Sequence, residues 1–562
     1  MHKHITTLSL AGLATALVAC AEHAPPEETV TVAPPAQPEQ HQAPNPPAVN
    51  PQAEAKIQDS VQHSATLGAA ERVAGMPAPR APGLSLPVDR ENYLHYRDNP
   101  VVQAAREPRS TFSIDVDTAS YANVRRMLER EGRLPPSDAV RLEEMINYFS
   151  YSYPVPTSTD LPFGVSTEVA PAPWSDGHQL LQIGIKGYEV APDQRSPANL
   201  VFLVDVSGSM QSPDKLGLVK QSLRLLVNRM QDDDRIAIAA YAGNAGIVLE
   251  STPGSEKARI LAAIDGLEAG GSTHGSAGIR LAYNLARQHR IEGGINRVII
   301  ASDGDMNVGT VSMEALKDLV ERQRRDGIAL TTLGFGTGNY NYALMEQLAD
   351  VGDGNAAYID SLQEAQKVLV TEMQSTLLTI ASDVKIQVEF NPAVVSEYRL
   401  IGYENRMLNP EDFSNDKVDA GDIGAGHTVT ALYEIALVGS GGERVPALRY
   451  TARPTSRAPA DAELAFVKLR YKVPGSDSSR EVSRAVRTEQ RASHIDAGSD
   501  DLRFAASVAG FGQLLQGGRF TGDWNYADAI SLARSARGND PHGLRGEFLR
   551  LIELAQSLSS ES

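Results

Sequence analysis

The middle of the chain alternates apolar runs with segments that have one apolar face. From about 197 to 381, the runs "ANLVFLVD", "NRVIIASDG" and "IALTTLGFG" are apolar at nearly every position, as expected of strands buried on both faces. Between them, apolar residues recur at helical spacing. The segment after the first run carries five on one face: Leu216, Val219, Leu223, Leu226 and Met230. The pattern predicts an α/β domain with a doubly wound, mostly parallel, Rossmann-like sheet.

The sequence on either side of this region follows a period of two instead. Leu181, Ile183 and Ile185 alternate with other residues within 163–190, which predicts a half-buried strand. The runs "DVKIQVEFNP", "TVTALYEIAL" and "LAFVKLRYKV" alternate likewise after 382. We predict a β-sandwich-like unit whose strands around 163–190 and 382–475 pack together. The α/β domain would then be inserted between two halves of that unit, or flanked by it.

Further helices are predicted at both ends of the folded part. "DTASYANVRRMLEREG" reads as a helix capped by Thr118 or Asp117, and "PPSDAVRLEEMINYFSY" as a second one. "LQEAQKVLVTEMQSTLLTIA" predicts one long helix at the end of the α/β domain. From 500 onward, four apolar residues lie on one helical face: Phe504, Val508, Phe511 and Leu515. "DVDTAS" also spaces two carboxylates like the start of a calcium loop, but it lacks the glycine and glutamate that such a loop needs.

The first twenty residues have the pattern of an export signal. In "MHKHITTLSLAGLATALVAC", Lys3 precedes an apolar run from Leu8 to Ala19 that is too short to span a bilayer as a helix. The run ends at Cys20, the only cysteine, and resembles the bacterial lipobox, in which that cysteine is acylated, for example with palmitate. By analogy with that family, Ala21 favours the outer membrane. We therefore expect a lipid-anchored protein of the cell envelope, facing the periplasm or the cell surface.

Composition divides the remaining chain and excludes one class of partner. Residues 21–87 are rich in Pro, Ala and Gln and predict a disordered tether. The predicted organisation is therefore a signal peptide 1–20, the tether 21–87, an N-terminal region 88–195, the α/β domain 196–381 and a β-rich, then helical domain 382–562. The formal net charge of −18 repels phosphate backbones, so no nucleic-acid partner is expected.

Five oxygen-bearing side chains follow the predicted strands of the α/β domain. Asp205, Ser207 and Ser209 leave the first strand, Thr273 precedes a helix in "GGSTHGS", and Asp303 ends "RVIIASDG". Ligands of open α/β sheets bind at the carboxyl ends of the strands, where these residues are expected to meet. Two carboxylates and three hydroxyls suit Mg²⁺, and also Mn²⁺ or Ca²⁺. If some ligands act through water, the ion stays electrophilic toward an outside carboxylate.

At these positions the chain resembles the von Willebrand factor type A domain. The metal-ion-dependent adhesion site of that domain has the pattern Asp-x-Ser-x-Ser, a later Thr and a later Asp, and all five positions match here. The sequence from "STFSIDVDTASYANVRRMLEREG" onward and the one from "DVKIQVEFNPAVVSEYRL" onward resemble the regions that precede and follow this domain in a family of bacterial exported proteins. This resemblance covers roughly 90 to 555 and implies the architecture. The match of the five positions to the adhesion site implies cation-dependent protein binding.

The sequence favours a binding module over an enzyme. It contains no G-x-S-x-G nucleophile elbow and no H-E-x-x-H motif. We expect a lipid-anchored, non-catalytic module whose metal binds an Asp or Glu of a partner protein. Two alternatives stay open: a metal-assisted hydrolase that uses the same ion to activate water, and a structural envelope protein with a vestigial metal site.

Overall fold

The computed structural model describes residues 91, 93–156, 161–191, 194–271, 275–304, 312–337, 340–446, 462–476 and 478–560. These residues belong to one compact unit. The predicted signal peptide with Cys20, the tether and Thr273 lie outside the described residues. Among the helices in the described ranges, none combines the length and apolar character needed to cross a bilayer.

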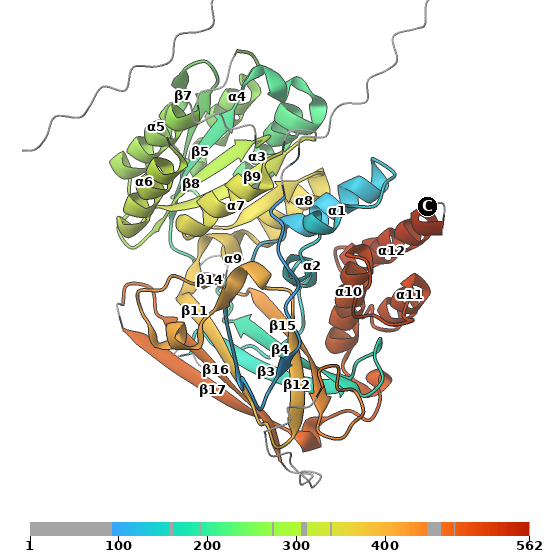
Figure 1. Cartoon of the computed structure of the whole chain (residues 1–562). Coiled ribbons are helices and arrows are strands. Elements are labelled where there is room, and N and C mark those ends of the chain that lie inside the picture. The colour runs from blue at the N-terminus through green and yellow to red at the C-terminus, as the bar shows by residue number, and fades with distance from the viewer. Residues whose placement is uncertain are drawn as a thin grey trace, which may run out of the picture. The chain divides into compact units, whose positions relative to one another are not determined.

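A six-stranded sheet forms the centre of the α/β domain (Figure 1). Its strands are β5 (Ala198–Asp205), β6 (Arg235–Tyr241), β7 (Ala245–Pro253), β8 (Ile295–Ser302), β9 (Ala329–Phe335) and β10 (Ala356–Ile359). The spatial order is β10-β9-β8-β5-β6-β7, and all neighbours are parallel except β6 and β7. The predicted mostly parallel sheet is confirmed.

Helices cover both faces of this sheet (Figure 1). On one face, Leu200, Phe202 and Val204 share a core with α3 (Leu218–Arg229), α4 (Lys257–Asp265) and α8 (Leu362–Gln366). On the other face, Val201 and Leu203 pack with helices of the opposite layer. That layer consists of α5 (Gly275–Gln288), α6 (Met313–Arg325) and α7 (Tyr342–Val351). Because successive side chains of β5 enter different cores, its apolar run has no polar positions, as the doubly wound arrangement requires.

Two antiparallel sheets form the sandwich beside the α/β domain. One has the order β1 (Val102–Gln103), β12 (Val395–Ile401), β15 (Thr428–Leu437), β4 (His178–Gly187) and β3 (Phe163–Pro171). The other has the order β13 (Met407–Leu408), β2 (Arg109–Ser113), β11 (Thr379–Phe390), β16 (Glu463–Lys472) and β17 (Ser479–Arg487), with β14 (Gly421–Gly424) beside β11. Strand β4 precedes the α/β domain in the chain, yet it pairs with β15 from beyond it. The α/β domain is therefore inserted into the β unit.

The strand β4 is buried on both faces, so the prediction of a half-buried strand is wrong. Leu181, Ile183 and Ile185 belong to the sandwich core, as their alternation indicates. Leu180, which points the other way, belongs to a second core. The helices of that second core are α1 (Ala119–Glu129), α2 (Leu142–Asn147), α10 (Asp500–Leu515), α11 (Tyr526–Ser535) and α12 (Leu544–Ser560). They cover the outer face of the first sheet.

Aromatic residues from both ends of the described chain meet in this helical core. The ring of Phe149 stands edge-on to Tyr121, Phe504 and Phe548, with centroid separations of 5.2, 4.9 and 5.6 Å. The predicted apolar face of α10 is confirmed, because Phe504, Val508 and Phe511 are fully buried and Leu515 packs against the same core while partly exposed. The helices α1 and α2 thus form one layer with the C-terminal helices α10, α11 and α12.

The predicted long helix over 362–381 is wrong. The structure has α8, a turn of π-helix at Lys367–Thr371, the short α9 (Met373–Leu377), and then β11 from Thr379. Thr379 and Ala381 pair with Gly424 and Ile423 of β14. This pairing with β14 in the same sheet overrides the local helical pattern, as tertiary context often does.

The expected caps of α1 are also wrong. Thr118 holds the N-cap position, but its side chain makes no capping hydrogen bond. The Ser120 N–H donates instead to Glu144 Oε2 of α2, at 2.8 Å. Asp117 Oδ1 accepts from the Ala356 N–H at 2.7 Å, at the start of β10. The carboxylates of Glu144 and Asp117 therefore connect α1 to α2 and the segment before α1 to β10, and neither Thr118 nor Asp117 caps α1.

Candidate functional site

The carboxyl ends of β5 and β8 bring two aspartates to one edge of the sheet. The strands are parallel neighbours, with Val204 opposite Ala301. The next residues of β5 and β8 are Asp205 and Ser302, and Asp303 follows directly. Both aspartates are fully buried. Their burial without a solvent shell requires compensating donors or cations nearby.

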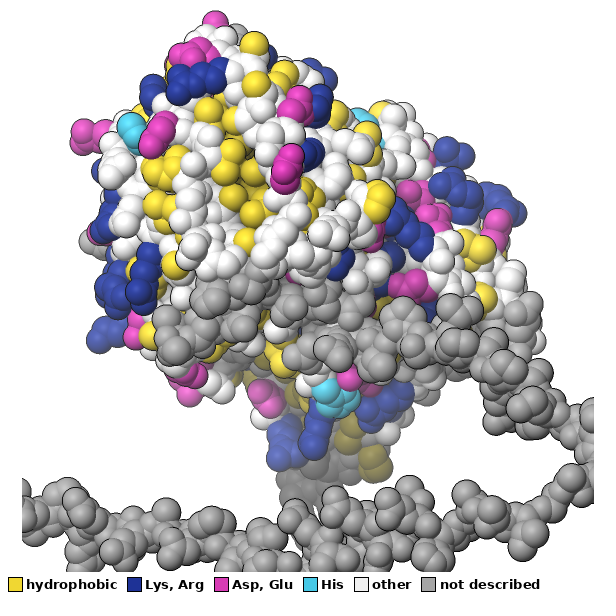
Figure 2. Space-filling view, turned by 90° about the horizontal axis from the view of Figure 1, so that it is seen from above, with side chains coloured by type: hydrophobic (Ala, Val, Ile, Leu, Met, Phe, Trp, Pro, Cys, Tyr) yellow, Lys and Arg dark blue, Asp and Glu magenta, His cyan; other side chains and the backbone are white. Residues whose placement is uncertain are grey.

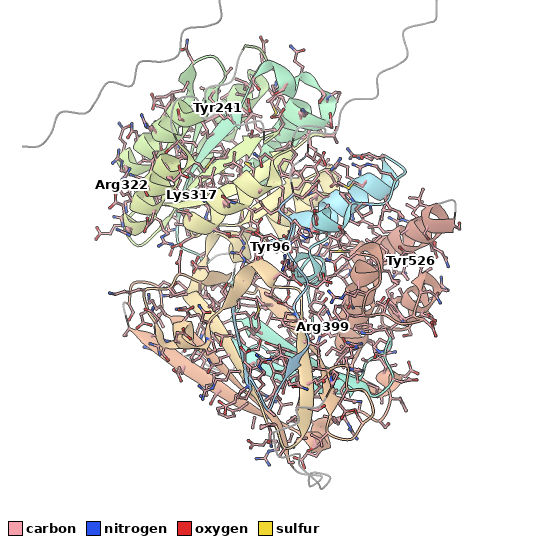
Figure 3. The ribbon with its side chains drawn as sticks, viewed as in Figure 1. Tyr96, Tyr241, Lys317, Arg322, Arg399 and Tyr526 are labelled. Atoms are coloured by element: carbon pink, nitrogen blue, oxygen red, sulfur yellow. The ribbon has the colours of Figure 1, made fainter. Side chains whose placement is uncertain are left out.

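Asp205 receives three such donors. Its Oδ1 accepts from the Ser207 N–H at 2.8 Å, and its Oδ2 accepts from the Tyr241 hydroxyl at 3.0 Å and the Ser302 hydroxyl at 3.1 Å. Tyr241 ends β6, the neighbour of β5, within the α/β domain (Figure 3). Burial raises the pKa of Asp205 and the nearby Asp303 adds to the rise, whereas hydrogen bonds from Ser207 and Tyr241 oppose it.

The loop after β5 presents the two serine hydroxyls. Ser207 Oγ lies 2.9 Å from Ser209 Oγ; Ser207 is buried, whereas Ser209 is exposed. The Gly208 N–H donates to the Gly271 carbonyl at 3.0 Å, which holds this loop against the one that leads toward Thr273. Thr273 itself lies outside the described residues. The structure thus places Asp205, Ser207, Ser209 and Asp303 together, and their role as ligands stays a prediction.

Three neighbours of the site were missed by sequence reasoning. Tyr241 and Ser302 hydrogen-bond Asp205, and Lys215 Nζ lies 3.0 Å from Asp303 Oδ2. Tyr241 and Ser302 end apolar runs, so the rule that points to Asp303 also points to them. Lys215 has no such signal, because a lysine near a helix start is normally a solvated residue.

The side-chain ligand atoms of Asp205, Ser207, Ser209 and Asp303 suit a divalent cation. All of them are oxygens, which Mg²⁺ and Mn²⁺ prefer, and the ammonium of Lys215 already balances the charge of Asp303 as a cation would. Within the described ranges, no three His, Cys, Asp or Glu side chains are grouped to hold a metal. A metal here would therefore depend on the hydroxyls as much as on the two carboxylates.

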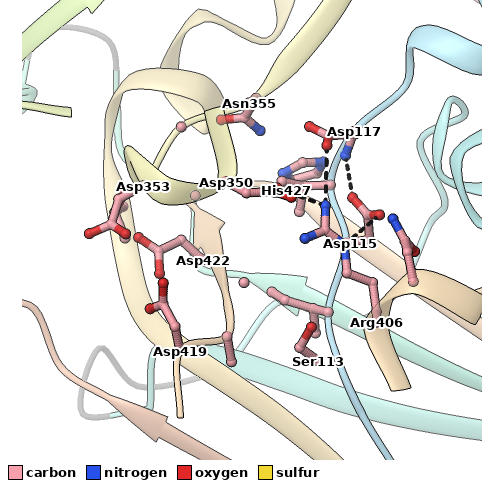
Figure 4. Close-up of a pocket in the computed structure, with 18 of the residues that line it drawn as sticks. Ser113, Asp115, Asp117, Asp350, Asp353, Asn355, Arg406, Asp419, Asp422 and His427 are labelled. Atoms are coloured by element: carbon pink, nitrogen blue, oxygen red, sulfur yellow. Dashed lines mark hydrogen bonds and ion pairs between the residues drawn. The ribbon is translucent and has the colours of Figure 1, made fainter. Parts of the chain in front are cut away.

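A second acidic cluster lies between the α/β domain and the sandwich. It lines a cavity of about 250 Å³ (Figure 4). Arg406 contacts Asp115 at 2.9 Å, Asp117 at 3.3 Å and Asp350 at 2.8 Å. The two carboxylates of "DVDTAS" are therefore paired with a guanidinium, and they join the N-terminal region, α7 and the segment before β13.

Glu346 of α7, near this cluster, gives a pH-dependent prediction. Its Oε1 accepts from Asn405 Nδ2 at 2.7 Å, and burial, then Asp350, raises its pKa to about 7. Above its ordinary pKa, near 4.5, Glu346 ionises in the unfolded chain but keeps its proton in the folded one until about pH 7. The unfolded state then binds fewer protons, so stability falls as pH rises across this window.

We expect Glu346→Gln to remove part of this loss, because glutamine keeps the acceptor for Asn405 without the ionisation. The free energy of unfolding of the wild type should fall by about 1–3 kcal/mol more than that of the variant between pH 5 and pH 8. Urea unfolding at both pH values measures the difference. Parallel losses in the two proteins would show that Glu346 does not titrate in this range.

Three families match successive parts of the chain. Residues 87–182 match a family described as von Willebrand factor, and residues 199–372 match the von Willebrand factor type A domain. Residues 375–558 match a family described as the C-terminal part of the uncharacterized protein YfbK. The metal-site residues predicted here all fall within the type A match. Domains of this type generally act in protein–protein interaction or adhesion.

The chain is also similar to individual proteins and solved structures. The chain is 47% identical over 477 residues to the uncharacterized protein YfbK of Escherichia coli K12, covering 84% of this chain and 82% of that protein. It is 27% identical over 262 residues to human inter-alpha-trypsin inhibitor heavy chain H3, covering 42% and 28% respectively. A solved von Willebrand factor type A protein from Catenulispora acidiphila aligns at 15% identity with a TM-score of 0.38, covering 69% and 89%. The chain therefore belongs to the YfbK family of von Willebrand factor type A domain proteins.

Proposed function

We propose that this protein binds a partner protein through a divalent cation held at the carboxyl edge of the type A sheet. The observation that carries the proposal is the meeting of Asp205, Ser207, Ser209 and Asp303 at that edge. The predicted ligands are these four residues and Thr273. When bound, Mg²⁺ or Mn²⁺ would supply an electrophilic centre that accepts an outside oxygen.

The chemistry of the site favours an acidic group of the partner. Two carboxylates balance a divalent ion only formally, and serine hydroxyls are weak, neutral donors. An added carboxylate, from an Asp or Glu of the partner, is therefore the strongest ligand that such an ion can gain. Ser209 is exposed while Asp205, Ser207 and Asp303 are buried, so the site opens on the side of Ser209.

The surface near the site offers apolar contact as well. Ile247 and Val248 of β7 are 44% and 40% exposed, and β7 pairs with β6, whose end carries Tyr241. Figure 2 shows apolar side chains gathered among charged ones on the face seen from above, where Figure 1 has β7 and α4. Protein interfaces commonly combine exposed apolar area with charged groups of this kind.

The proposal includes the cellular setting. We propose that Cys20 carries a lipid anchor and that residues 21–87 act as a tether, so the type A domain meets partners in the cell envelope. The lipobox-like end of the apolar run and the Pro-rich composition support this.

Crosslinking in intact cells tests the proposal. We expect the wild type to recover a partner in Mg²⁺ at least tenfold more efficiently than in chelator, and Asp303→Ala to lose this difference. Asp232→Ala is the matched control, because Asp232 is exposed and precedes β6, at the opposite edge of the sheet. Equal recovery with and without chelator would favour the structural alternative. Ester or phosphoester hydrolysis lost on Asp303→Ala would favour the hydrolase.

A further inference from the structure

At the candidate metal site, the ammonium of a lysine lies against one of the predicted carboxylate ligands, where a bound cation would be expected. Lys215 Nζ lies 3.0 Å from Asp303 Oδ2, and the two side chains are 10% and 0% exposed. The contact is a buried ion pair between residues 88 positions apart in the chain. It therefore depends on the fold and is not the chance approach of two surface side chains.

The aliphatic part of Lys215 fits a slot that the fold provides. Directly after β9, Gly336 has φ +76°, and a Cβ placed there would lie 2.3 Å from both Cγ and Cε of Lys215. Any side chain at 336 would therefore displace the lysine. The Gly336 carbonyl accepts from the Tyr358 hydroxyl at 2.5 Å, which fixes the floor of the slot. The lysine is thus directed at Asp303 from a preformed groove.

The backbone around Lys215 is arranged to deliver this side chain. The turn of π-helix at Pro213–Gly217 departs from helical geometry at Lys215, with φ −112° and ψ −106°. This turn lies between the loop with Ser207 and Ser209 and the start of α3. Any movement of Lys215 is therefore linked through a short stretch of chain to two predicted ligands.

We propose that Lys215 is a built-in counter-cation that competes with the divalent ion for Asp303 and so sets the metal affinity of the site. This inference rests on the metal-binding role proposed above. A divalent ion bound to Asp303 would lie close to the ammonium of Lys215, which contacts the same carboxylate. The two positive charges would repel each other, and the buried site holds little water to screen them. Metal binding therefore requires the ammonium to withdraw from Asp303. Without metal, the lysine neutralises a buried carboxylate that would otherwise destabilise the fold.

The test is a Mn²⁺ titration of the full chain, followed by the electron paramagnetic resonance signal of the free ion. We expect Lys215→Met to bind Mn²⁺ at least tenfold more tightly than the wild type, because methionine keeps an apolar stem over Gly336 without the charge. Lys215→Gln should also bind more tightly. Lys220→Met is the matched control: it removes one nearby positive charge whose ammonium donates to the Asp265 carbonyl at the surface, and its affinity should stay at the wild-type level.

Thermal unfolding gives a second readout that a merely structural lysine would not produce. In chelator, Lys215→Met should melt below the wild type, because Asp303 has lost its counter-ion. In saturating Mn²⁺ the difference in melting temperature should shrink, since the tighter metal stabilises the variant more, whereas loss of a merely structural lysine would leave it unchanged.

The outcomes separate this inference from the proposed function. If the wild type binds Mn²⁺ and both Lys215 variants bind no tighter, Lys215 is not a competitor, although the metal site stands. If no variant and no wild-type protein binds Mn²⁺, the metal site fails and the inference fails with it. If the Lys215 variants bind while the wild type does not, the lysine holds the site closed.

Discussion

Replacing Arg125 by methionine is expected to lower the free energy of unfolding by about 3–5 kcal/mol, because it leaves several buried carboxylates without their cation. The Arg125 guanidinium contacts Asp360 at 2.5 Å, Glu364 at 2.7 Å and Glu547 at 2.9 Å. None of the four side chains is more than 6% exposed. They come from α1, from the end of β10, from α8 and from α12.

This network joins three parts of the molecule, so its loss should also separate their unfolding. Urea unfolding, followed by circular dichroism and by hydrogen exchange of α12, measures both effects. Arg534→Met is the matched control, because Arg534 pairs with Glu553 at 3.4 Å and both are more than half exposed. That change should cost less than about 1 kcal/mol. Equal effects of the two substitutions would mean that the Arg125 network contributes no more than a surface ion pair.

Replacing Asp205 by alanine is expected to weaken Mn²⁺ binding by at least about 100-fold, which corresponds to about 2.7 kcal/mol or more. Asp205 supplies one of the two carboxylates that the described residues bring to the site. Its removal also leaves the donors of Ser207, Tyr241 and Ser302 without their acceptor. Part of the effect would therefore come from disorder of the loop after β5.

Asp205→Asn separates these causes, because its single amide oxygen keeps the donors of either Oδ1 or Oδ2, whereas alanine keeps neither set. A Mn²⁺ titration should show a similar loss for Asp205→Asn, with a smaller loss of stability than Asp205→Ala. Asp232→Asn, at the opposite edge of the sheet, should bind Mn²⁺ like the wild type. Undiminished binding by Asp205→Asn would show that the carboxylate charge is not what holds the ion.

The parts of the structure that the sequence predicts are those governed by local pattern. Leu200 to Val204 enter two cores in turn, so an unbroken apolar run is required of any such strand. Asp205 and Asp303 follow from the same logic, since parallel neighbours end at one edge. The type A sheet and the positions of these two residues could therefore be predicted without coordinates.

The parts that could not be predicted depend on contacts between distant residues. The outer face of β4 is buried by a helical layer that includes α10, α11 and α12 from beyond residue 499, and the end of the predicted long helix becomes β11 because β14 pairs with it. Likewise, only the fold brings Lys215 to Asp303. In each case the local pattern allows two answers, and a partner far along the chain decides between them.

Diffraction from a crystal grown in Mn²⁺, with the anomalous signal of the ion, tests the central claim most directly. We expect one Mn²⁺ at the carboxyl edge of the sheet, with the hydroxyl oxygens of Ser207 and Ser209 about 2.0–2.3 Å from the ion. Asp205 and Asp303 should bind the ion directly or through water. Lys215 should have withdrawn from Asp303. An edge with no anomalous signal at saturating Mn²⁺, and Lys215 still on Asp303, would contradict it.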